Sequence, residues 1–392
     1  MGETRSGDTD SAEPGDSREA GDEAIPRAGV CPPEPSASSG PADEPDRARP
    51  PRSRRRGGWA ARLLTTAGWA ATAAAALGVA LYYGVSERFS AVLLASFAPY
   101  LMLGSGIGLV LFAIARRFRA VLVALAVLLG GAWTQLPLFV ADGHPGGLPF
   151  VVIQANLLYG AADADVITAT ARENKADLLT VEELTGQAVA GLSAAGIDTE
   201  LPYHYLRPGG GASGSGIYSR YPMRDEKRFD GFVMANLGAV LDHPLLGPLP
   251  VFAFHPVPPS QDYRAWRIEM GLIRDILANA PTPAVAGGDF NATRDHAAFR
   301  ALLGGRFGEA ADLAGAGPQL TFPADRRWGP IIGIDHVLVA AGAAESVRTV
   351  VVPGSDHRSV LARVLIGGNH RRRRRRARAD RVSRTRRRPG SR

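Results

Sequence analysis

The chain has 392 residues and a formal net charge of +7, so it can hold one large domain or two ordinary ones with a sizeable core. The charge lies at the ends: residues 371–392 contain 13 Arg and one Asp, whereas residues 1–50 contain 12 acidic and 5 basic residues. The part between them is therefore nearly neutral, and a single cysteine, Cys31, excludes an intramolecular disulfide.

Both ends of the chain are predicted to be disordered. Residues 1–58 are acidic at first and then basic, and they are rich in Pro, Gly, Ser, Asp and Glu, a composition that buries too little apolar surface to fold. Residues 369–392 are predicted to form an Arg-rich disordered tail. This tail could bind nucleic acid, an anionic polymer or lipid headgroups, or it could be a solvated low-complexity extension.

Three charge-free runs follow the N-terminal region, at residues 63–86, 89–115 and 120–141. They contain 24, 27 and 22 residues, and a helix needs about 20 apolar residues to cross the hydrocarbon core of a bilayer. A buried helical hairpin or a signal peptide is the alternative, but a signal peptide has one apolar region of about 7–15 residues. We therefore expect three transmembrane helices within residues 59–141.

The distribution of positive charge predicts the orientation of these helices. The sequence RPPRSRRRGG precedes the first run and RRFR joins the second to the third, whereas the loop around SERF carries one Arg and one Glu. Because cytoplasmic loops carry an excess of Lys and Arg, the N-terminus is expected in the cytoplasm. Three crossings then place the chain after Asp142 outside the cell, as part of a multi-pass protein of the cell membrane.

Strand-like and helix-like segments alternate after a predicted linker at residues 142–148. This alternation predicts one α/β domain at residues 149–368, with helices covering its sheets. The helical patterns lie at residues 163–175 and 262–279. The strand-like runs are FVVIQAN (150–156), DLLTVEEL (177–184), VFAFH (251–255), the apolar part of PAVAGGDFNAT (283–293), IDHVLV (334–339) and a final run ending in SDHRSVLARVL (355–365).

Polar side chains stand at the ends of these predicted strands. Each of them has an ordinary explanation by itself, as a turn residue, a strand cap or a solvent-facing group. Because sites in α/β folds are assembled from several such ends, the whole set indicates a functional site. The residues are Asn156, Glu182, Glu183, His255, Asp289, Asn291, Asp335, His336, Asp356 and His357.

The segment GGDFN at residues 287–291 raises a specific alternative. Side chains two residues apart on a strand share a face, so Asp289 and Asn291 are expected to point the same way while Phe290 points into the core. Gly, Asp and Asn are also the commonest turn residues. By itself, the segment is therefore either a turn or part of a site.

In their order along the chain, the motifs QAN, EEL, FHP, GDFNAT, IDHVLV and SDHRSV resemble the endonuclease/exonuclease/phosphatase superfamily. Its members are magnesium-dependent phosphodiesterases that include DNase I-like nucleases, sphingomyelinases and inositol phosphatases. The resemblance covers roughly residues 149–367 and, with the apolar runs, suggests a membrane-anchored bacterial type. It implies a four-layer α/β sandwich, two packed β-sheets flanked by helices, preceded by three transmembrane helices.

The resemblance implies a metal site in the first two motifs. Asn156 and Glu183 would bind Mg²⁺, or Mn²⁺ in its place, and Glu182 occupies the position where the family usually has glutamine. Magnesium prefers oxygen ligands, usually one or two carboxylates together with substrate phosphate and water, which suits these residue types. The metal would polarise a phosphoryl oxygen and stabilise the departing oxygen.

The remaining motifs are implied to act on water and phosphate. His357 would help to activate the attacking water, and Asp289 would align that water or share the role of general base. Asn291 and His255 would hold phosphate oxygens, so the catalytic residues lie in the FHP, GDFNAT and SDHR motifs. No covalent intermediate with the enzyme is implied.

Two further acids are expected to support His357. Asp356 precedes it in the sequence and could orient its ring, although in many family members a different acid does so. Asp335, before the strand HVLV, is expected to support the site without contacting the substrate. Asp356 is therefore counted among the catalytic residues, and Asp335 among their neighbours.

The expected function is that of a membrane-anchored, metal-dependent phosphoesterase that hydrolyses phosphodiester or phosphomonoester bonds outside the cell. The linker after Asp142 extends by at most about 28 Å, which keeps the site near the bilayer. That proximity favours a phospholipid headgroup slightly over nucleic acid, whereas the Arg-rich tail favours nucleic acid. No obligate protein partner is evident.

Two other classes of protein are the alternatives. A non-catalytic surface module for binding or scaffolding is expected to have lost at least one of Glu183, Asp289, Asn291 and His357, and all four are present. A nucleic-acid-binding protein acting through the Arg-rich tail alone would leave the polar strand ends unexplained.

Overall fold

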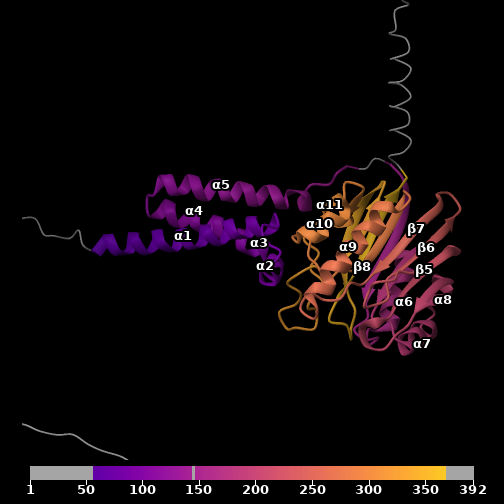
Figure 1. The fold of residues 1–392 in the computed structure, drawn as a ribbon. Helices are drawn as coiled ribbons and strands as arrows, with labels where there is room; N and C mark the ends of the chain where they lie inside the picture. Colours follow the sequence, from indigo (N-terminus) through magenta and orange to yellow (C-terminus); the bar gives the residue numbers. More distant parts are fainter. Residues whose placement is uncertain (1–55, 144–145, 368–392) are drawn as a thin grey trace, which may run out of the picture. The chain divides into compact units, whose positions relative to one another are not determined.

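The computed structural model describes residues 56–143 and 146–367 (Figure 1). The predictions for the N-terminal region before residue 56, for Cys31 and for the Arg-rich tail lie outside the described residues. Residues 56–58 begin the first helix. Everything described here belongs to one compact unit of the chain, Arg54–Arg392.

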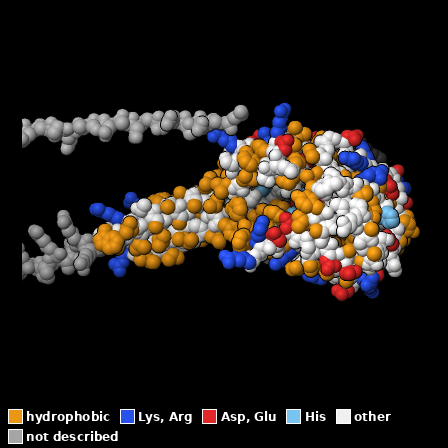
Figure 2. Space-filling model, turned by 90° about the horizontal axis from the view of Figure 1, so that it is seen from below, with side chains coloured by type: hydrophobic (Ala, Val, Ile, Leu, Met, Phe, Trp, Pro, Cys, Tyr) orange, Lys and Arg blue, Asp and Glu red, His pale blue; other side chains and the backbone are white. Residues whose placement is uncertain are grey.

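The N-terminal part of the described chain is helical, and hydrophobic side chains cover most of its surface in Figure 2. Large apolar residues are exposed on it, among them Leu103, Ile107 and Trp133, with 66%, 57% and 72% of their surface accessible. Helices that are apolar on their outer faces are typical of a membrane environment. They are α1 Arg56–Tyr82, α2 Phe89–Ala95, α3 Ala98–Met102, α4 Gly104–Ile114, α5 Phe118–Gln135 and the 3₁₀ helix η2 Leu136–Phe139.

Two of these helical stretches, Gly58–Tyr82 and Phe118–Phe139, are long and apolar enough to cross a bilayer. Between them, Phe89–Ala95 and Ala98–Ile114 pass the same test only as a pair, and the pair is bent by 72°. Within residues 56–143 and 146–367, the structure therefore has two helices that could span a membrane, or three if the bent pair is one span.

Small residues let α1 and α4 pack closely. A Cβ atom on Gly104 would overlap the carbonyl oxygen of Ala71, and one on Gly108 would overlap the hydroxyl of Thr72. Thr72 donates that hydroxyl to the carbonyl oxygen of Gly68 at 2.8 Å, so its polar group is satisfied within α1. Small residues at helix contacts are characteristic of helices that associate in lipid.

Two mixed six-stranded sheets follow and pack face to face (Figure 1). The first sheet has the order β11-β12-β1-β2-β4-β3, and the second has the order β5-β6-β7-β8-β10-β9. Apolar side chains from both sheets form the core between them. The strands of the first sheet are β1 Leu148–Asn156, β2 Leu178–Glu182, β3 Tyr203–Arg207, β4 Ser215–Ser219, β11 Gly342–Val351 and β12 Arg358–Ile366.

Helices cover the outer faces of both sheets. α6, α7 and α8 pack on the first sheet, and α9 and α10 pack on the second. The predicted α/β sandwich is thus confirmed as two mixed sheets with flanking helices.

The strands of the second sheet are β5 Met223–Arg228, β6 Leu237–His243, β7 Gly247–Phe254, β8 Ala284–Asp289, β9 Phe307–Glu309 and β10 Asp335–Ala340. The helices are α6 Ala164–Asn174, α7 Gly186–Ala194, α8 Ile197–Glu200, α9 Tyr263–Asn279, α10 Ala297–Leu303 and α11 Ala310–Ala314, with the 3₁₀ helix η3 Gly211–Ser213.

Local sequence signals define the two helices that the sequence predicts in this domain. Asp163 caps α6 by accepting hydrogen bonds from the backbone N–H groups of Asp165 and Val166. Asp262 caps α9 in the same way, through the N–H of Ala265. Such capping satisfies N–H groups that have no partner within the helix. Both helices therefore begin where the sequence indicates.

Strand pairing brings the polar strand ends to one edge of the sandwich. β1 and β2 are parallel, with Asn156 opposite Glu182. β10 is antiparallel to β8, so Asp335 at its start lies opposite Asp289 at the end of β8. β12 is antiparallel to β1, and the segment before it, which contains His357, arrives at the same edge.

The two glycines before Asp289 are needed for close packing beneath this edge. A Cβ atom on Gly287 would overlap the hydroxyl oxygen of Thr180, on β2 of the other sheet. A Cβ atom on Gly288 would overlap the carbonyl oxygen of Phe254, on the neighbouring strand β7. Gly287 therefore lets the two sheets approach each other where β8 ends, and Gly288 lets β8 lie close to β7.

Substitution of Gly287 by Ala should destabilise the fold by about 1–3 kcal/mol, because the added methyl overpacks the contact with Thr180. Thr180→Ala in the same chain should restore much of the stability by making room. Gly271→Ala, on α9 with open space around it, is the matched control and should be neutral or slightly stabilising. Denaturant unfolding of the full chain in detergent, followed by tryptophan fluorescence, measures these differences. Equal stability of Gly287→Ala and the parent would contradict the packing argument.

Candidate active site

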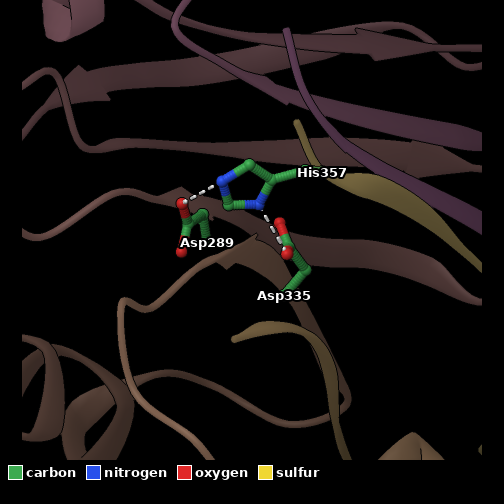
Figure 3. Close-up of side chains that lie close together, drawn as sticks. All are labelled: Asp289, Asp335 and His357. Carbon is green, nitrogen blue, oxygen red and sulfur yellow. Dashed lines mark hydrogen bonds and ion pairs between the residues drawn. The ribbon is translucent and has the colours of Figure 1, made fainter. Parts of the chain in front are cut away.

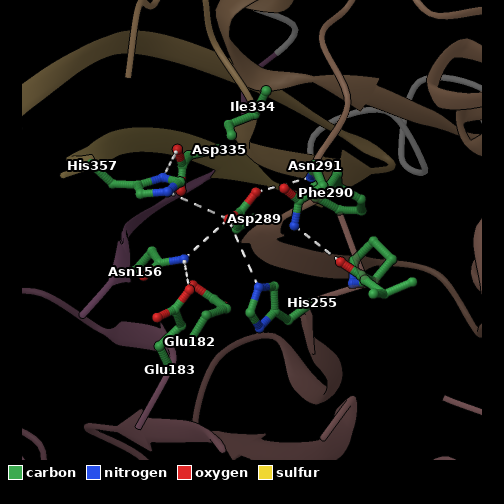
Figure 4. A network of polar contacts seen from close by, with 12 residues as sticks. Asn156, Glu182, Glu183, His255, Asp289, Phe290, Asn291, Ile334, Asp335 and His357 are labelled. Atoms are coloured by element: carbon green, nitrogen blue, oxygen red, sulfur yellow. Dashed lines mark hydrogen bonds and ion pairs between the residues drawn. The ribbon is translucent and has the colours of Figure 1, made fainter. Parts of the chain in front are cut away.

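Asp289 is the centre of a buried polar network at the converging strand ends (Figure 4). Its Oδ2 accepts a hydrogen bond from Asn156 Nδ2 at 3.0 Å, and its Oδ1 accepts one from the backbone N–H of Asn291 at 2.9 Å. The Nε2 atoms of His357 and His255 lie 3.7 and 3.9 Å from Oδ2. Groups from four separate segments of the chain thus meet at one carboxylate.

The GGDFN segment is a turn that also organises the site. β8 ends at Asp289, and Asn291 has a φ of 48°, in the left-handed region that Asn tolerates better than most residues. The strand therefore does not continue to Asn291 as its spacing predicts, because the chain turns directly after Asp289. Asn291 donates its amide to the carbonyl oxygen of Pro256 at 3.0 Å, whereas Phe290 is fully buried, as expected.

His357 takes its main partner from the second sheet. Its Nδ1 lies 2.8 Å from Asp335 Oδ2 (Figure 3), and the other oxygen of Asp335 accepts a hydrogen bond from Gln154 Nε2 at 2.9 Å. The ring of Phe322 packs against the imidazole with 4.9 Å between ring centres. Asp356 Oδ1 lies 3.9 Å from Nε2, beyond hydrogen-bond distance. Asp335, and not the sequence neighbour Asp356, is therefore the acid that orients His357.

The adjacent glutamates have different surroundings. Glu182, the last residue of β2, is fully buried and accepts a hydrogen bond from Gln154 Nε2 at 2.8 Å. Glu183 lies beyond the strand with a φ of 57° and is only partly buried. It accepts hydrogen bonds from Asn156 Nδ2 at 3.2 Å and from the backbone N–H of Tyr159 at 2.8 Å. Glu183 thus lies beside Asn156 on the accessible side, and Glu182 lies beneath the network.

Burial and neighbouring charges move the pKa values of the central groups apart. Burial and the nearby Asp335 raise the pKa of Asp289 to about 7, against the influence of His357. Although burial favours the neutral ring, Asp335 and Asp289 raise the pKa of His357 to about 10. Burial and the charge on His357 lower the pKa of His255 to about 3. These surroundings favour the protonated ring of His357 and the neutral ring of His255.

Carboxylates outnumber cations among the described residues of this network. Glu182, Glu183, Asp289 and Asp335 lie around the imidazolium of His357, and ionised carboxylates are costly to bury without compensating positive charge. Asp289, Asp335 and His357 each offer one ligand atom, and these atoms lie within 4.8 Å of one another. The group could hold a metal ion, and its oxygen-rich surroundings suit a hard divalent cation.

Three residues of the site were not found from the sequence. Gln154 links Glu182 to Asp335 and belongs to the QAN motif, where its position on a buried strand was the available signal. Asn236 holds the backbone of His255: its Oδ1 accepts the N–H at 2.8 Å, and its Nδ2 donates to the carbonyl at 3.1 Å. Phe322 lies in a long loop with no recognisable pattern.

A sequence model of the Endonuclease/Exonuclease/phosphatase family matches residues 153–357, which are 205 of the 392 residues and include every residue of the network described above. The chain belongs to this family. Membership accounts for the two mixed sheets and for the gathering of acids and histidines at one edge. No curated protein has a sequence that matches this one.

Solved structures of low sequence identity resemble this family member. D. rerio TDP2 in complex with a single-strand DNA product is 13% identical, with a TM-score of 0.47, and the match covers 55% of this chain and 98% of that one. A conserved protein of unknown function from Enterococcus faecalis V583 is 17% identical, with a TM-score of 0.46 and coverage of 56% and 100%. An endonuclease/exonuclease/phosphatase from Bacteroides vulgatus is 19% identical, with a TM-score of 0.44 and coverage of 56% and 100%.

The pKa of His357 tests which acid orients it in this family member. Asp335→Asn should lower that pKa by about 1–3 units, because it removes the opposite charge nearest to the ring. Asp356→Asn is the matched control and should have a smaller effect, since its carboxylate lies farther from the ring. The pKa of His357 in each variant is measured by following the NMR signals of its ring as the pH is changed. The sample is the full chain in detergent with a chelator. A larger shift in the Asp356 variant would contradict the pairing with Asp335.

Proposed function

We propose that the protein is a membrane-anchored, metal-dependent phosphoesterase that hydrolyses phosphodiester or phosphomonoester bonds by direct attack of water. The network around Asp289 carries this proposal, because it buries several carboxylates and two histidines together. Such a cluster costs stability unless it binds or activates something. Membership of the endonuclease/exonuclease/phosphatase family supports the same class of reaction.

Asn156 and Glu183 would hold the divalent cation, Mg²⁺ or Mn²⁺. The two side chains are adjacent, since Asn156 Nδ2 donates to Glu183 Oε1 at 3.2 Å, and each carries an oxygen atom of the kind that such cations prefer. The excess of carboxylates supports this proposal, since a cation would offset their mutual repulsion. When bound, the cation would supply Lewis-acid stabilisation of the charge that develops on the phosphoryl group and the leaving oxygen.

The other side chains would position water and phosphate. Asp335 fixes the ring of His357 through Nδ1, so its Nε2 faces Asp289, and these two residues would align the attacking water. Asp289, with a pKa of about 7, is suited to accept the proton of that water at neutral pH. His255 and Asn291 would donate hydrogen bonds to phosphate oxygens, His255 as a neutral ring.

The membrane placement in this proposal is three spans, with the N-terminus in the cytoplasm and the catalytic domain outside the cell. The contacts of α3 and α4 along α1 support a third crossing, because Ala98 packs on Gly78, Gly104 packs on Ala71 and Gly108 packs on Gly68. From Ala98 onward, the second apolar run is thus antiparallel to α1. Arg116 and Arg117 follow α4 directly, as the positive-inside rule requires for a cytoplasmic loop.

The substrate would be a phospholipid headgroup or a nucleic acid. Assays of hydrolysis can distinguish these two substrate classes. The full chain in detergent with Mg²⁺ should be offered phospholipids, DNA, RNA and phosphomonoesters, with the release of phosphate or of the cleaved ester measured. Activity on phospholipid alone would agree with a site held close to the bilayer. No hydrolysis of any substrate by folded protein would favour the non-catalytic alternative.

Asp289→Asn, Asn291→Ala and His357→Ala should each lower turnover by about 10²-fold or more, because each removes a group that positions a proton or a developing charge. The triple variant should lose far less than the product of the single losses, since these groups act as a unit. Asp275→Asn, on the exposed face of α9, is the control and should retain full turnover. Steady-state kinetics on the best substrate of the panel measures these effects. Near-normal turnover of Asp289→Asn would rule out its catalytic role.

Glu183→Gln should raise the Mg²⁺ concentration needed for activity and lower turnover, because it removes a charge from the proposed metal site at nearly constant shape. Glu182→Gln is the matched comparison, and it should change the Mg²⁺ requirement much less. Activity as a function of Mg²⁺ concentration gives the Mg²⁺ requirement and the turnover of each variant. Melting temperatures check that the variants are folded. If the two effects were exchanged, Glu182 would be the metal ligand.

A further inference from the structure

A cavity of about 360 Å³ lies where the ends of the membrane helices meet the catalytic domain. Its volume falls within the range of ligand pockets in proteins, about 300–1,000 Å³. It is outside the network around Asp289, and its walls come from the helices, from the end of η2 and from the loop at residues 318–333. The apolar part of its lining includes Tyr100, Leu103, Leu138, Leu320, Ile331 and Ile332.

The polar side chains that line the cavity are engaged with one another. Gln135 Nε2 donates to Asp295 Oδ1 at 2.9 Å, and this bond links α5 to the catalytic domain. His336 Nδ1 lies 3.1 Å from Glu309 Oε1, and both side chains are buried. Because these groups already have partners, the free surface of the cavity is chiefly apolar. It suits a hydrocarbon chain better than a polar headgroup.

The apolar wall continues onto the outer surface of the membrane helices. Tyr100, Leu103, Ile107, Val110 and Ile114 are spaced by three or four residues, so they form one stripe along α3 and α4. The last four of them expose 66%, 57%, 54% and 62% of their surface. A stripe of this kind faces lipid, and it leads directly into the cavity.

The cavity lies at the depth of the membrane–water interface. Ala98–Ile114 is about 25 Å long at 1.5 Å per residue, close to the thickness of about 30 Å of the hydrocarbon core. Arg116 and Arg117 follow its other end, so Tyr100 lies near the opposite interface, where tyrosine is enriched. The Tyr100 hydroxyl donates to the carbonyl oxygen of Ile331 at 2.6 Å. This hydrogen bond holds the loop at residues 318–333 beside Tyr100, near the interface.

We propose that this cavity binds an acyl chain of a membrane phospholipid, which enters along the stripe on α3 and α4. The proposal rests on the membrane placement given above and is independent of hydrolysis. The chain would lie against one side of the loop at residues 318–333. From the same loop, Phe322 packs on the catalytic His357. The bound lipid would thus support the loop that forms part of the active site.

Photocrosslinking tests the proposal with the full chain in nanodiscs of phosphatidylcholine and phosphatidylglycerol that contain a phospholipid with a diazirine in its acyl chain. After irradiation, mass spectrometry should locate the label on the loop at residues 318–333 as well as on the lipid-facing helices. Leu103→Trp, at the exposed mouth, and Leu320→Trp, in the wall, should reduce labelling of the loop by about tenfold, the effect of losing two buried methylenes. Leu122→Trp, on the exposed face of α5, is the matched control and should leave it unchanged.

Labelling confined to the membrane helices would overturn the proposal, because it would show only the lipid that surrounds any membrane protein. Equal labelling of the loop in the parent and in both cavity-filling variants, each confirmed as folded by its melting temperature, would also overturn it. A photoreactive amino acid at Leu320 gives a second test in the same nanodiscs. Its crosslinks should be to phospholipid, and crosslinks to residues 1–55 or to a second copy of the chain would assign the cavity to that occupant instead.

Discussion

The negative charge of the buried carboxylates must be compensated by positive charge, and the arrangement of the strand ends depends on this constraint. Asp289 and Asp335 are both fully buried and lie opposite each other in the pairing of β8 with β10. In an apolar interior, two such carboxylates cannot both be ionised without a cation between or beside them. His357 meets this requirement in part, since its ring lies between them and holds its proton strongly.

This constraint explains why several segments must end at one edge of the sandwich. Gln154 comes from β1 and bridges Glu182 and Asp335, so the amide couples the acids of the two sheets. The bridge spans the gap between the sheets and therefore requires that they lie close together. Gly287 allows that approach, because any larger residue would collide with Thr180 on the facing sheet. Gly287 is thus a packing requirement of the charge network, and the turn begins only after Asp289.

The sequence predicted those parts of the site that are marked by local patterns. Asn156, Glu183, Asp289 and His357 stand next to apolar runs, and a run followed by a polar residue identifies a strand end without knowledge of the fold. The fold class followed from the same alternation of strands and helices. These features depend on neighbours in the sequence, which is why they could be read from it.

The pairing of His357 with Asp335 could not be read in this way. It depends on the registers of two strand pairs in different sheets, whereas the adjacent Asp356 is the only acid that sequence proximity suggests. The bend of 72° between the two halves of the second apolar run does have a local signal, because Pro99 stands in the first turn of α3, directly after the break. The pairing of His357 with Asp335 is thus decided by packing between segments far apart in the chain, whereas the bend coincides with a local signal.

The attachment of the α/β domain to the N-terminal helices has a simple electrostatic cause. The last carbonyl groups of a helix have no partners within it and carry partial negative charge. Arg294 donates to the carbonyl oxygen of Thr134 in the last turn of α5, at 3.0 Å, and Arg300 donates to that of Tyr82 at the end of α1.

His296 completes the attachment, because its Nε2 lies 2.8 Å from the carbonyl oxygen of Val92 in α2. Its Nδ1 accepts the backbone N–H of Thr293 at 2.8 Å, which places the ring proton on Nε2, facing α2. Arg294, His296 and Arg300 begin only three residues after Asn291. One short stretch of chain therefore ends β8, turns at Asn291 and then donates hydrogen bonds to carbonyl groups of α5, α2 and α1. Any movement of the helix ends would act on this stretch, so the position of the N-terminal helices relative to the site depends on the same residues that follow the turn at Asn291.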